Sequence, residues 1–188
     1  MQFVFGSFAG KERVSIDTKE YSHILKVRRV KLGDKLYFRN LEDHFLYTYQ
    51  IEEISKKQAS LQLVTSEYKA VLPAKELHIA WCIVDPKTIE KYLAMLNEIG
   101  VTSLAFVYAD FSQKNYKIDK ERIQRILINS SQQCGRSNLL HVEYFTSIYE
   151  YVSAYPDTAV IDFCESHLEC DTEHKRFLVG PEGGFSKN

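Results

Sequence analysis

The sequence predicts an α/β domain that follows a small, β-rich N-terminal module. Residues 1–70 contain short alternating apolar segments separated by turn signals, which is typical of a small barrel. From Glu76 onward, apolar strands alternate with segments of helical periodicity, as in a parallel sheet. Residues 69–73 are a plausible linker, because Pro73 cannot donate to a sheet and biases its neighbour toward extended backbone. We therefore expect one domain over residues 1–70 and a second over residues 74–188.

Composition excludes several classes of protein. The 188 residues are 45% hydrophobic and 26% charged, which is typical of a folded globular chain rather than a disordered one. No apolar run approaches the roughly 18 residues of a membrane-spanning helix. The N-terminus lacks the basic start of a secretory signal. The four cysteines are therefore expected to be free thiols, and the protein to be cytoplasmic.

The N-terminal module should contain four strands and one brief helical stretch. The strands are predicted at residues 13–16, 35–39, 45–51 and 59–64. Thr18 is expected to cap the helical stretch, and Gly33 with Asp34 to form a turn. Residues 23–31 include five His, Lys or Arg that alternate with apolar side chains. Such a segment can pack one side into the barrel and offer the other to phosphates.

The second domain begins with a nearly unbroken apolar run, residues 77–84, which predicts a strand buried on both faces. Asp85 is expected to cap the following helix, which Pro86 opens and Gly100 ends. A long helix is predicted from its Asp119 cap to Cys134, closed by Gly135. Further strands are predicted at residues 103–107, 158–163 and 176–179.

The most specific chemical signal is the loop 180–185, Gly-Pro-Glu-Gly-Gly-Phe, directly after the last predicted strand. Its three glycines allow positive φ angles and let a ligand approach the main chain closely. In open α/β sheets, ligands lie at the carboxyl ends of strands, which is where this loop follows. Its spacing matches neither a Walker A loop nor the dinucleotide fingerprint, so an ordinary glycine turn is the alternative interpretation.

Charge is unevenly distributed along a chain whose net charge is −1. Residues 1–40 carry nine Lys or Arg against four Asp or Glu, whereas residues 141–173 carry eight acidic residues and no basic one. Basic regions can form a surface for a polyanion, although solvated faces explain them equally well. Arg122 and Arg125 are interpreted as solvated, whereas Arg136, just past the helix end, is a candidate for binding phosphate or carboxylate.

The sequence gives little support for a metal site or a catalytic triad. A cluster of zinc-ligand types is formed by Cys164, His167, Cys170 and His174. Four ligands within eleven residues would need a tight knuckle, and no glycine is present there to form its turns. We therefore predict no metal and a polar loop between strands. Cys82 is interpreted as a buried thiol, and Glu98 and Asp110 as single carboxylates without an evident partner.

Four motifs together resemble the ribosomal RNA small subunit methyltransferase E family of the SPOUT superfamily, over essentially the whole chain. They lie at residues 23–28 with 33–34, 97–101, 133–136 and 179–185. The resemblance implies a PUA-like RNA-binding barrel followed by a SPOUT domain with a deep trefoil knot, acting as a homodimer. It implies methylation of N3 of a uridine in 16S ribosomal RNA, with S-adenosylmethionine as cofactor and the rRNA or small ribosomal subunit as partner.

The resemblance also assigns roles to residues of this chain. The cofactor's adenosine would be held, mainly through backbone groups, by Gly180, Pro181, Glu182, Gly183 and Gly184. Arg136 would orient the substrate or stabilise charge near the reaction centre. The RNA backbone would be contacted by His23, Lys26, Arg28 and Arg29. The resemblance does not identify the general base, for which Glu182 and Asp110 are the candidates, and the reaction needs no metal.

Family members continue for some tens of residues past the glycine loop, through a strand, a loop and a helix that threads the knot. This chain ends at Asn188, so we expect a C-terminally truncated form that need not be active by itself. Two other functions stay open. One is a non-catalytic RNA-binding protein that uses the barrel and the arginine-bearing helix as an electrostatic clamp. The other is an α/β enzyme that binds a small phosphorylated metabolite at the glycine loop.

Overall fold

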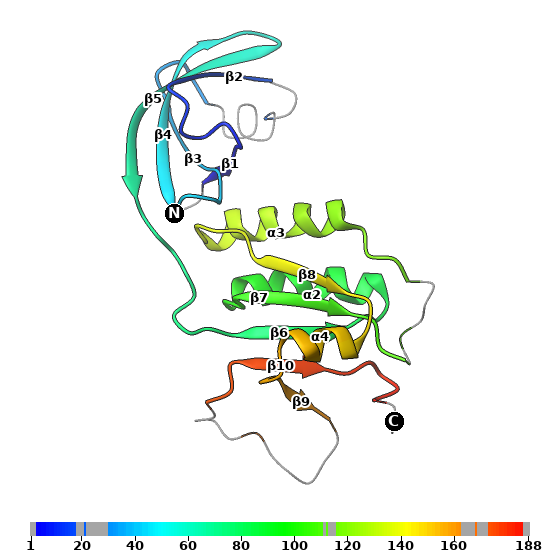
Figure 1. The fold of residues 1–188 in the computed structure, drawn as a ribbon. Coiled ribbons are helices and arrows are strands. Elements are labelled where there is room, and N and C mark those ends of the chain that lie inside the picture. The colour runs from blue at the N-terminus through cyan, green and yellow to red at the C-terminus, as the bar shows by residue number, and fades with distance from the viewer. Residues whose placement is uncertain are drawn as a thin grey trace. The chain divides into compact units, whose positions relative to one another are not determined.

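The computed structural model describes residues 3–17, 21, 30–110, 112, 116–162, 168 and 173–185. The chain forms two compact units (Figure 1). The first contains residues 1–72 and 131–139, and the second contains residues 73–130 and 140–188. The first unit carries a mixed, largely antiparallel sheet and the second a parallel sheet with helices, which confirms the predicted fold class.

The first unit has a five-stranded sheet in the order β1-β3-β4-β5-β2. Its strands are β1 (Val4–Phe5), β2 (Arg13–Asp17), β3 (Lys35–Arg39), β4 (Phe45–Ile54) and β5 (Gln58–Tyr68). The apolar alternation buries one side chain in two, so that Phe38, Tyr49 and Leu61 are fully buried in one cluster. The two-residue β1 was not predicted, because it is too short to show alternation.

The core of the first unit also holds a buried hydroxyl whose hydrogen bonds are satisfied. Tyr49 donates its phenolic proton to the Lys11 carbonyl at 2.7 Å and accepts the Gly10 N–H at 3.0 Å. Burial raises the pKa of Tyr49. The hydroxyl thus ties the chain before β2 to the centre of the sheet.

The second unit has a five-stranded, wholly parallel sheet in the order β8-β7-β6-β10-β9. Its strands are β6 (His78–Cys82), β7 (Ser103–Val107), β8 (His141–Phe145), β9 (Ala159–Ile161) and β10 (Arg176–Val179). Its helices are α2 (Pro86–Glu98), α3 (Lys120–Cys134), whose last turn belongs to the first unit, and α4 (Ile148–Ala154). In Figure 1, α4 and α2 lie on opposite faces of this sheet.

The predicted start of α2 is confirmed: Asp85 caps the helix by accepting the Thr88 N–H, and Pro86 is its first residue. At the far end, the chain turns at Gly100, whose φ is +95°. A buried hydrogen bond of 2.7 Å from Asn97 Nδ2 to Ser130 Oγ joins α2 to α3. The amide side chain near the end of α2 therefore helps to hold the helix pair together.

Small residues of β6 and β7 form the surface on which α4 packs. Ala80, Cys82 and Ala105 lie in one buried cluster with Tyr151 of α4 and Leu178 of β10. Burial raises the pKa of the Cys82 thiol to about 12, so it is protonated at neutral pH, as expected of a core thiol. Within the described ranges, none of the helices is long and apolar enough to span a bilayer.

Candidate active site

The order of strands in the second unit reverses between β6 and β10. From β6 the chain runs through α2 to β7 on one side, whereas β10 and β9 lie on the other side. In open α/β sheets, such a switch point leaves a crevice beyond the carboxyl ends of the two neighbouring strands. Val179 pairs with Trp81, so the two strands end at nearly the same level. The glycine loop and the start of α2 therefore leave the sheet side by side.

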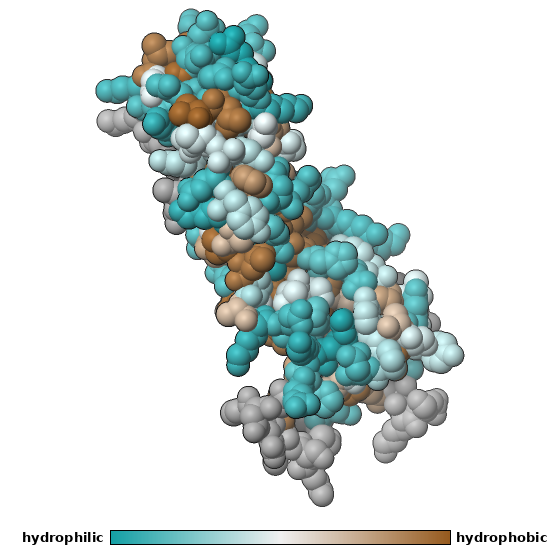
Figure 2. All heavy atoms as spheres, turned by 60° about the vertical axis from the view of Figure 1, so that its left-hand side comes forward, coloured by the Kyte–Doolittle hydropathy of each residue, from teal (hydrophilic) through white to brown (hydrophobic). Residues whose placement is uncertain are grey.

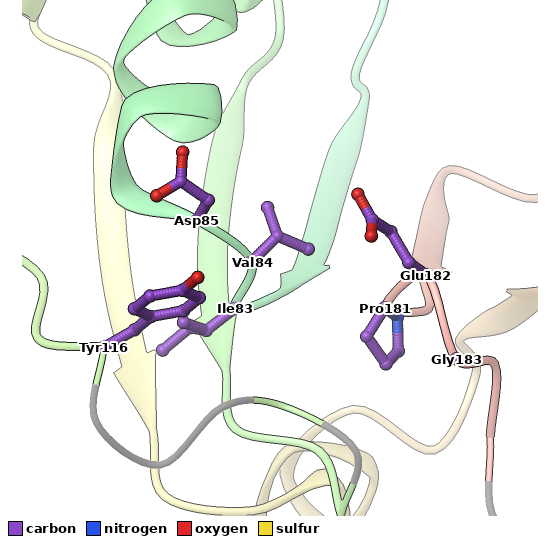
Figure 3. A pocket seen from close by; sticks show the side chains of 7 residues that line it. All are labelled: Ile83, Val84, Asp85, Tyr116, Pro181, Glu182 and Gly183. Carbon is purple, nitrogen blue, oxygen red and sulfur yellow. The ribbon is translucent and has the colours of Figure 1, made fainter.

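A pocket of about 200 Å³ lies at this switch point (Figure 3). It is lined by Ile83, Val84, Asp85, Tyr116, Pro181, Glu182 and Gly183. Figure 3 shows Asp85 and Tyr116 across the pocket from Pro181 and Glu182. Three of the five cofactor residues predicted from the sequence, Pro181, Glu182 and Gly183, thus border this cavity.

Two glycines give the loop its shape. The Gly184 N–H donates to the Pro181 carbonyl at 2.9 Å, which closes a tight turn, and the φ of Gly184 is +71°. A Cβ on Gly184 would meet nothing within 4 Å, so the main chain is open there. A Cβ on Gly180 would lie 2.9 Å from Phe185 Cε2. The missing side chain of Gly180 is therefore needed for the close approach of the Phe185 ring.

The charge of the pocket limits what it can bind. Among the described residues that line it, the charged side chains are those of Asp85 and Glu182, and none is a lysine or an arginine. An anionic lining repels a phosphate and attracts a cation. The pocket therefore does not favour a phosphorylated metabolite at the glycine loop, and it suits a ligand that carries positive charge.

Sequence reasoning missed four lining residues: Ile83, Val84, Asp85 and Tyr116. Asp85 was identified only as a helix cap, although the rule that pointed to the glycine loop applies equally to the end of β6. Tyr116 carried no signal, because it reaches the pocket from the long connection between β7 and α3. The Tyr108 hydroxyl donates to the Tyr116 carbonyl at 2.8 Å and fixes this part of the connection.

Arg136 belongs to the first unit and is not among the lining residues of the pocket. Its side chain is buried, with only 4% of the residue exposed, and its Nε donates to Asn138 Oδ1 at 3.0 Å. Burial lowers the pKa of the guanidinium, and nearby Cys134 opposes that change. Arg122 differs from this buried cation, because it makes a half-exposed ion pair with Glu90 at 3.0 Å.

The remaining candidates lie elsewhere in the chain. Glu98 and Asp110 do not line the pocket. The proposed RNA contacts His23, Lys26, Arg28 and Arg29 fall outside the described residues, as do Cys164, His167 and Cys170. Within the part of the chain that the structure describes, no group of three His, Cys, Asp or Glu side chains is placed to hold a metal ion.

Comparison with known proteins shows what class of protein this fold and site define. Residues 71–188 match the family described as RNA methyltransferase domain. Residues 16–64 match the family described as RNA methyltransferase PUA domain. The parallel sheet with its switch-point pocket is thus the methyltransferase part of an RNA methyltransferase.

The chain is 44% identical over 191 residues to ribosomal RNA small subunit methyltransferase E of Helicobacter pylori, an alignment that covers 100% of this chain and 84% of that protein. The chain belongs to the ribosomal RNA small subunit methyltransferase E family, which confirms the resemblance. A predicted RNA methyltransferase from Thermotoga maritima has the same fold, with a TM-score of 0.76, 25% identity and coverage of 99% of this chain and 83% of that one. The S-adenosylmethionine-bound family member from Neisseria gonorrhoeae has a TM-score of 0.80, 19% identity and coverage of 100% and 82%.

Proposed function

We propose that the protein transfers a methyl group from S-adenosylmethionine to N3 of a uridine in 16S ribosomal RNA. Family membership supports methylation of ribosomal RNA. Two solved proteins of the same fold carry S-adenosylmethionine, which supports the choice of cofactor. The observation that carries the proposal is the pocket between the ends of β6 and β10, bordered by the glycine loop and lined by two carboxylates.

The residues of the pocket fit S-adenosylmethionine. When bound, this cofactor supplies an activated methyl group on a positively charged sulfur. The open main chain around Gly184 leaves space for the flat adenine ring of the cofactor to approach backbone groups of the loop. Asp85 and Glu182 complement a sulfonium and an ammonium group. A cavity of about 200 Å³ is smaller than the roughly 300–1,000 Å³ of typical ligand pockets, so it would enclose only part of the cofactor.

In the proposed reaction, a bond forms between uridine N3 and the methyl carbon as the carbon–sulfur bond breaks, and sulfur keeps the electron pair. The N3 proton must leave before or during attack, with Glu182 and Asp110 as candidate acceptors. Arg136 would stabilise negative charge that develops on the uracil carbonyls. Alignment supplies much of the remaining rate enhancement, because the methyl donor is already activated. The target base must be unpaired or extruded from its stack to be reached.

The proposal extends to partners of the protein. We propose that His23, Lys26, Arg28 and Arg29 contact the RNA backbone, that two copies form the working dimer, and that the reaction takes place in the cytoplasm. The four side chains lie between residues 1 and 40, where basic residues outnumber acidic ones by nine to four. Such a cluster binds phosphates without reading base sequence.

The proposed function predicts one modified nucleoside in one RNA. The protein, expressed from its complete reading frame, is incubated with labelled S-adenosylmethionine and either small ribosomal subunits or naked 16S RNA. Nuclease digestion and mass spectrometry should identify N3-methyluridine at a single position. Methylation at carbon 5 or at the ribose hydroxyl would contradict the proposed atom. RNA binding that ignores S-adenosylmethionine, with no methylated nucleoside, would instead support the non-catalytic alternative.

The carboxylates of the pocket predict selectivity for the methyl donor, whose sulfur is positively charged, over the product S-adenosylhomocysteine, whose sulfur is neutral. The double variant Asp85→Asn with Glu182→Gln should lower the ratio of the two affinities about fivefold, a modest effect because Glu182 is exposed to solvent. Asparagine still caps α2, so the fold is preserved. Calorimetry measures both affinities. Fluorescence of Trp81, the one tryptophan of the chain, gives a second measure of binding, because Trp81 lies two residues before the pocket residue Ile83.

Glu98→Gln is the matched control for this selectivity, because Glu98 is an exposed carboxylate at the end of α2 that does not line the pocket. It should leave the affinity ratio unchanged. Equal losses of affinity for both ligands in the double variant would show that the two carboxylates do not respond to the sulfonium charge.

A further inference from the structure

We infer that His44, Ser137 and Asn138 form a positioning set for Arg136: they fix the direction of its guanidinium and thereby set the rate of methyl transfer. The inference rests on the catalytic role proposed for Arg136. All four residues belong to the first unit, where a loop between β3 and β4 meets the chain that follows α3.

Ser137 is the anchor of the positioning set. The residue is completely buried, and its N–H donates to the Val71 carbonyl at 3.0 Å. Its hydroxyl donates to the same carbonyl at 3.1 Å and accepts the Val71 N–H at 2.9 Å. The third contact of the hydroxyl is His44 Nδ1 at 3.1 Å. This contact makes His44 the third partner of the Ser137 hydroxyl, and the tautomer of the imidazole sets which of the two atoms donates.

The loop that carries His44 is itself held in one conformation. His44 and Leu41 both have φ of +65°, a left-handed backbone that residues other than glycine seldom adopt. Such residues persist only where their surroundings enforce the conformation. Here the buried Arg39 donates to the His44 carbonyl at 3.0 Å, and the Leu41 carbonyl accepts the Leu139 N–H at 3.3 Å. The loop therefore contacts the chain that follows Arg136 at two points, Ser137 and Leu139.

Asn138 acts on the guanidinium directly. Its Oδ1 accepts the Arg136 Nε proton at 3.0 Å, which restrains rotation of the planar group about its last bonds. Gly135, with φ of +87°, ends α3 and starts the segment in a defined direction. Arg136 thus lies between the turn at Gly135 and the buried Ser137. Its side chain is oriented by the hydrogen bond to Asn138. These contacts are unnecessary for ending a helix, and the hydrogen bond from Nε to Asn138 restrains the direction of the guanidinium.

A double-mutant cycle on kcat tests the positioning set. The variants Ser137→Ala and Asn138→Ala are made in the native protein and in an Arg136→Ala background, and single-turnover methyl transfer is measured on each. In the native background, each should lower the rate about tenfold and leave the affinity for S-adenosylmethionine unchanged. In the Arg136→Ala background, neither should lower the rate further, because the group they position is gone. Ser137→Thr, which keeps the hydroxyl, should retain most of the rate.

Tyr49→Phe is the matched control, because it removes a buried hydroxyl from the same unit without touching Arg136 or its neighbours. It should lower the melting temperature and leave kcat unchanged. Losses from Ser137→Ala and Asn138→Ala that multiply with the loss from Arg136→Ala would overturn the positioning role alone. An unchanged rate in Arg136→Ala would overturn the proposed catalytic role and this inference with it. If Ser137→Ala fails to fold, the half-buried Asn138 still completes the cycle.

Discussion

Replacing Arg136 by alanine is expected to lower kcat for methyl transfer about 100-fold, because removing one preorganised donor from developing negative charge typically costs a factor of roughly 100 to 1,000. Arg136→Lys should lose less, about tenfold, since lysine keeps the charge but not the planar fork that Asn138 orients. The affinity for S-adenosylmethionine should change less than about threefold in both. Single-turnover kinetics with small ribosomal subunits, together with calorimetry, separate the two quantities.

Arg122→Ala is the control for removal of a positive charge, because Arg122 makes only a half-exposed ion pair with Glu90. Exposed ion pairs contribute little, so its rate should stay within about twofold of the native protein. A loss of S-adenosylmethionine affinity in Arg136→Ala, with kcat preserved, would assign Arg136 to cofactor binding rather than to catalysis. A large rate loss in Arg122→Ala would show that the rate responds to removal of positive charge from α3 in general, and not to Arg136 in particular.

Gly180→Val is expected to weaken S-adenosylmethionine binding on the order of 30-fold. A single Cβ on Gly180 would already lie 2.9 Å from the Phe185 ring, and valine adds two further methyl groups to this close contact. Overpacking of this kind costs about 1–3 kcal/mol, here by displacing Phe185 and the turn between them. Calorimetric titration of the native and variant proteins gives the change in affinity.

A smaller side chain at residue 185 tests whether the clash with Phe185 causes the loss of S-adenosylmethionine affinity. Gly180→Ala should weaken binding, and the addition of Phe185→Leu should recover part of the loss by removing the clash. Gly33→Ala tests backbone strain alone, since Gly33 has φ of +85° in the first unit and only Gln50 Nε2 near its absent Cβ, at 3.9 Å. It should lower stability without changing the affinity for S-adenosylmethionine. Native affinity in Gly180→Val would show that the loop does not bind the cofactor.

Local sequence patterns were sufficient to predict an element when its structure depends mainly on the residues within it. The unbroken apolar run before Asp85 predicted β6, and the Asp-Pro pair predicted the start of α2. The same reasoning missed β8, whose side chains are only half buried beyond its first residue and whose sequence has no continuous apolar run. It also missed α4, whose seven residues are too few to show helical periodicity clearly.

Three of the seven lining residues of the candidate pocket were predicted from the sequence, and recognising the other four depended on topology. The three glycines marked the loop after β10, because their chemistry is local. Nothing in that loop indicates that β10 lies next to β6, so the start of α2 was not recognised as the opposite wall. The grouping of residues 131–139 with the first unit is likewise a long-range property, as in the 2.8 Å hydrogen bond from the Phe5 N–H to Gln132 Oε1.

The most direct test of the central claim, that the pocket between β6 and β10 holds the methyl donor, is a crystal structure of the protein with S-adenosylmethionine bound. We expect the adenosine to lie against the main chain of residues 180–184, with the charged sulfur on the side of Asp85 and Glu182. A cofactor bound at any other place, with this pocket left empty, would contradict the claim.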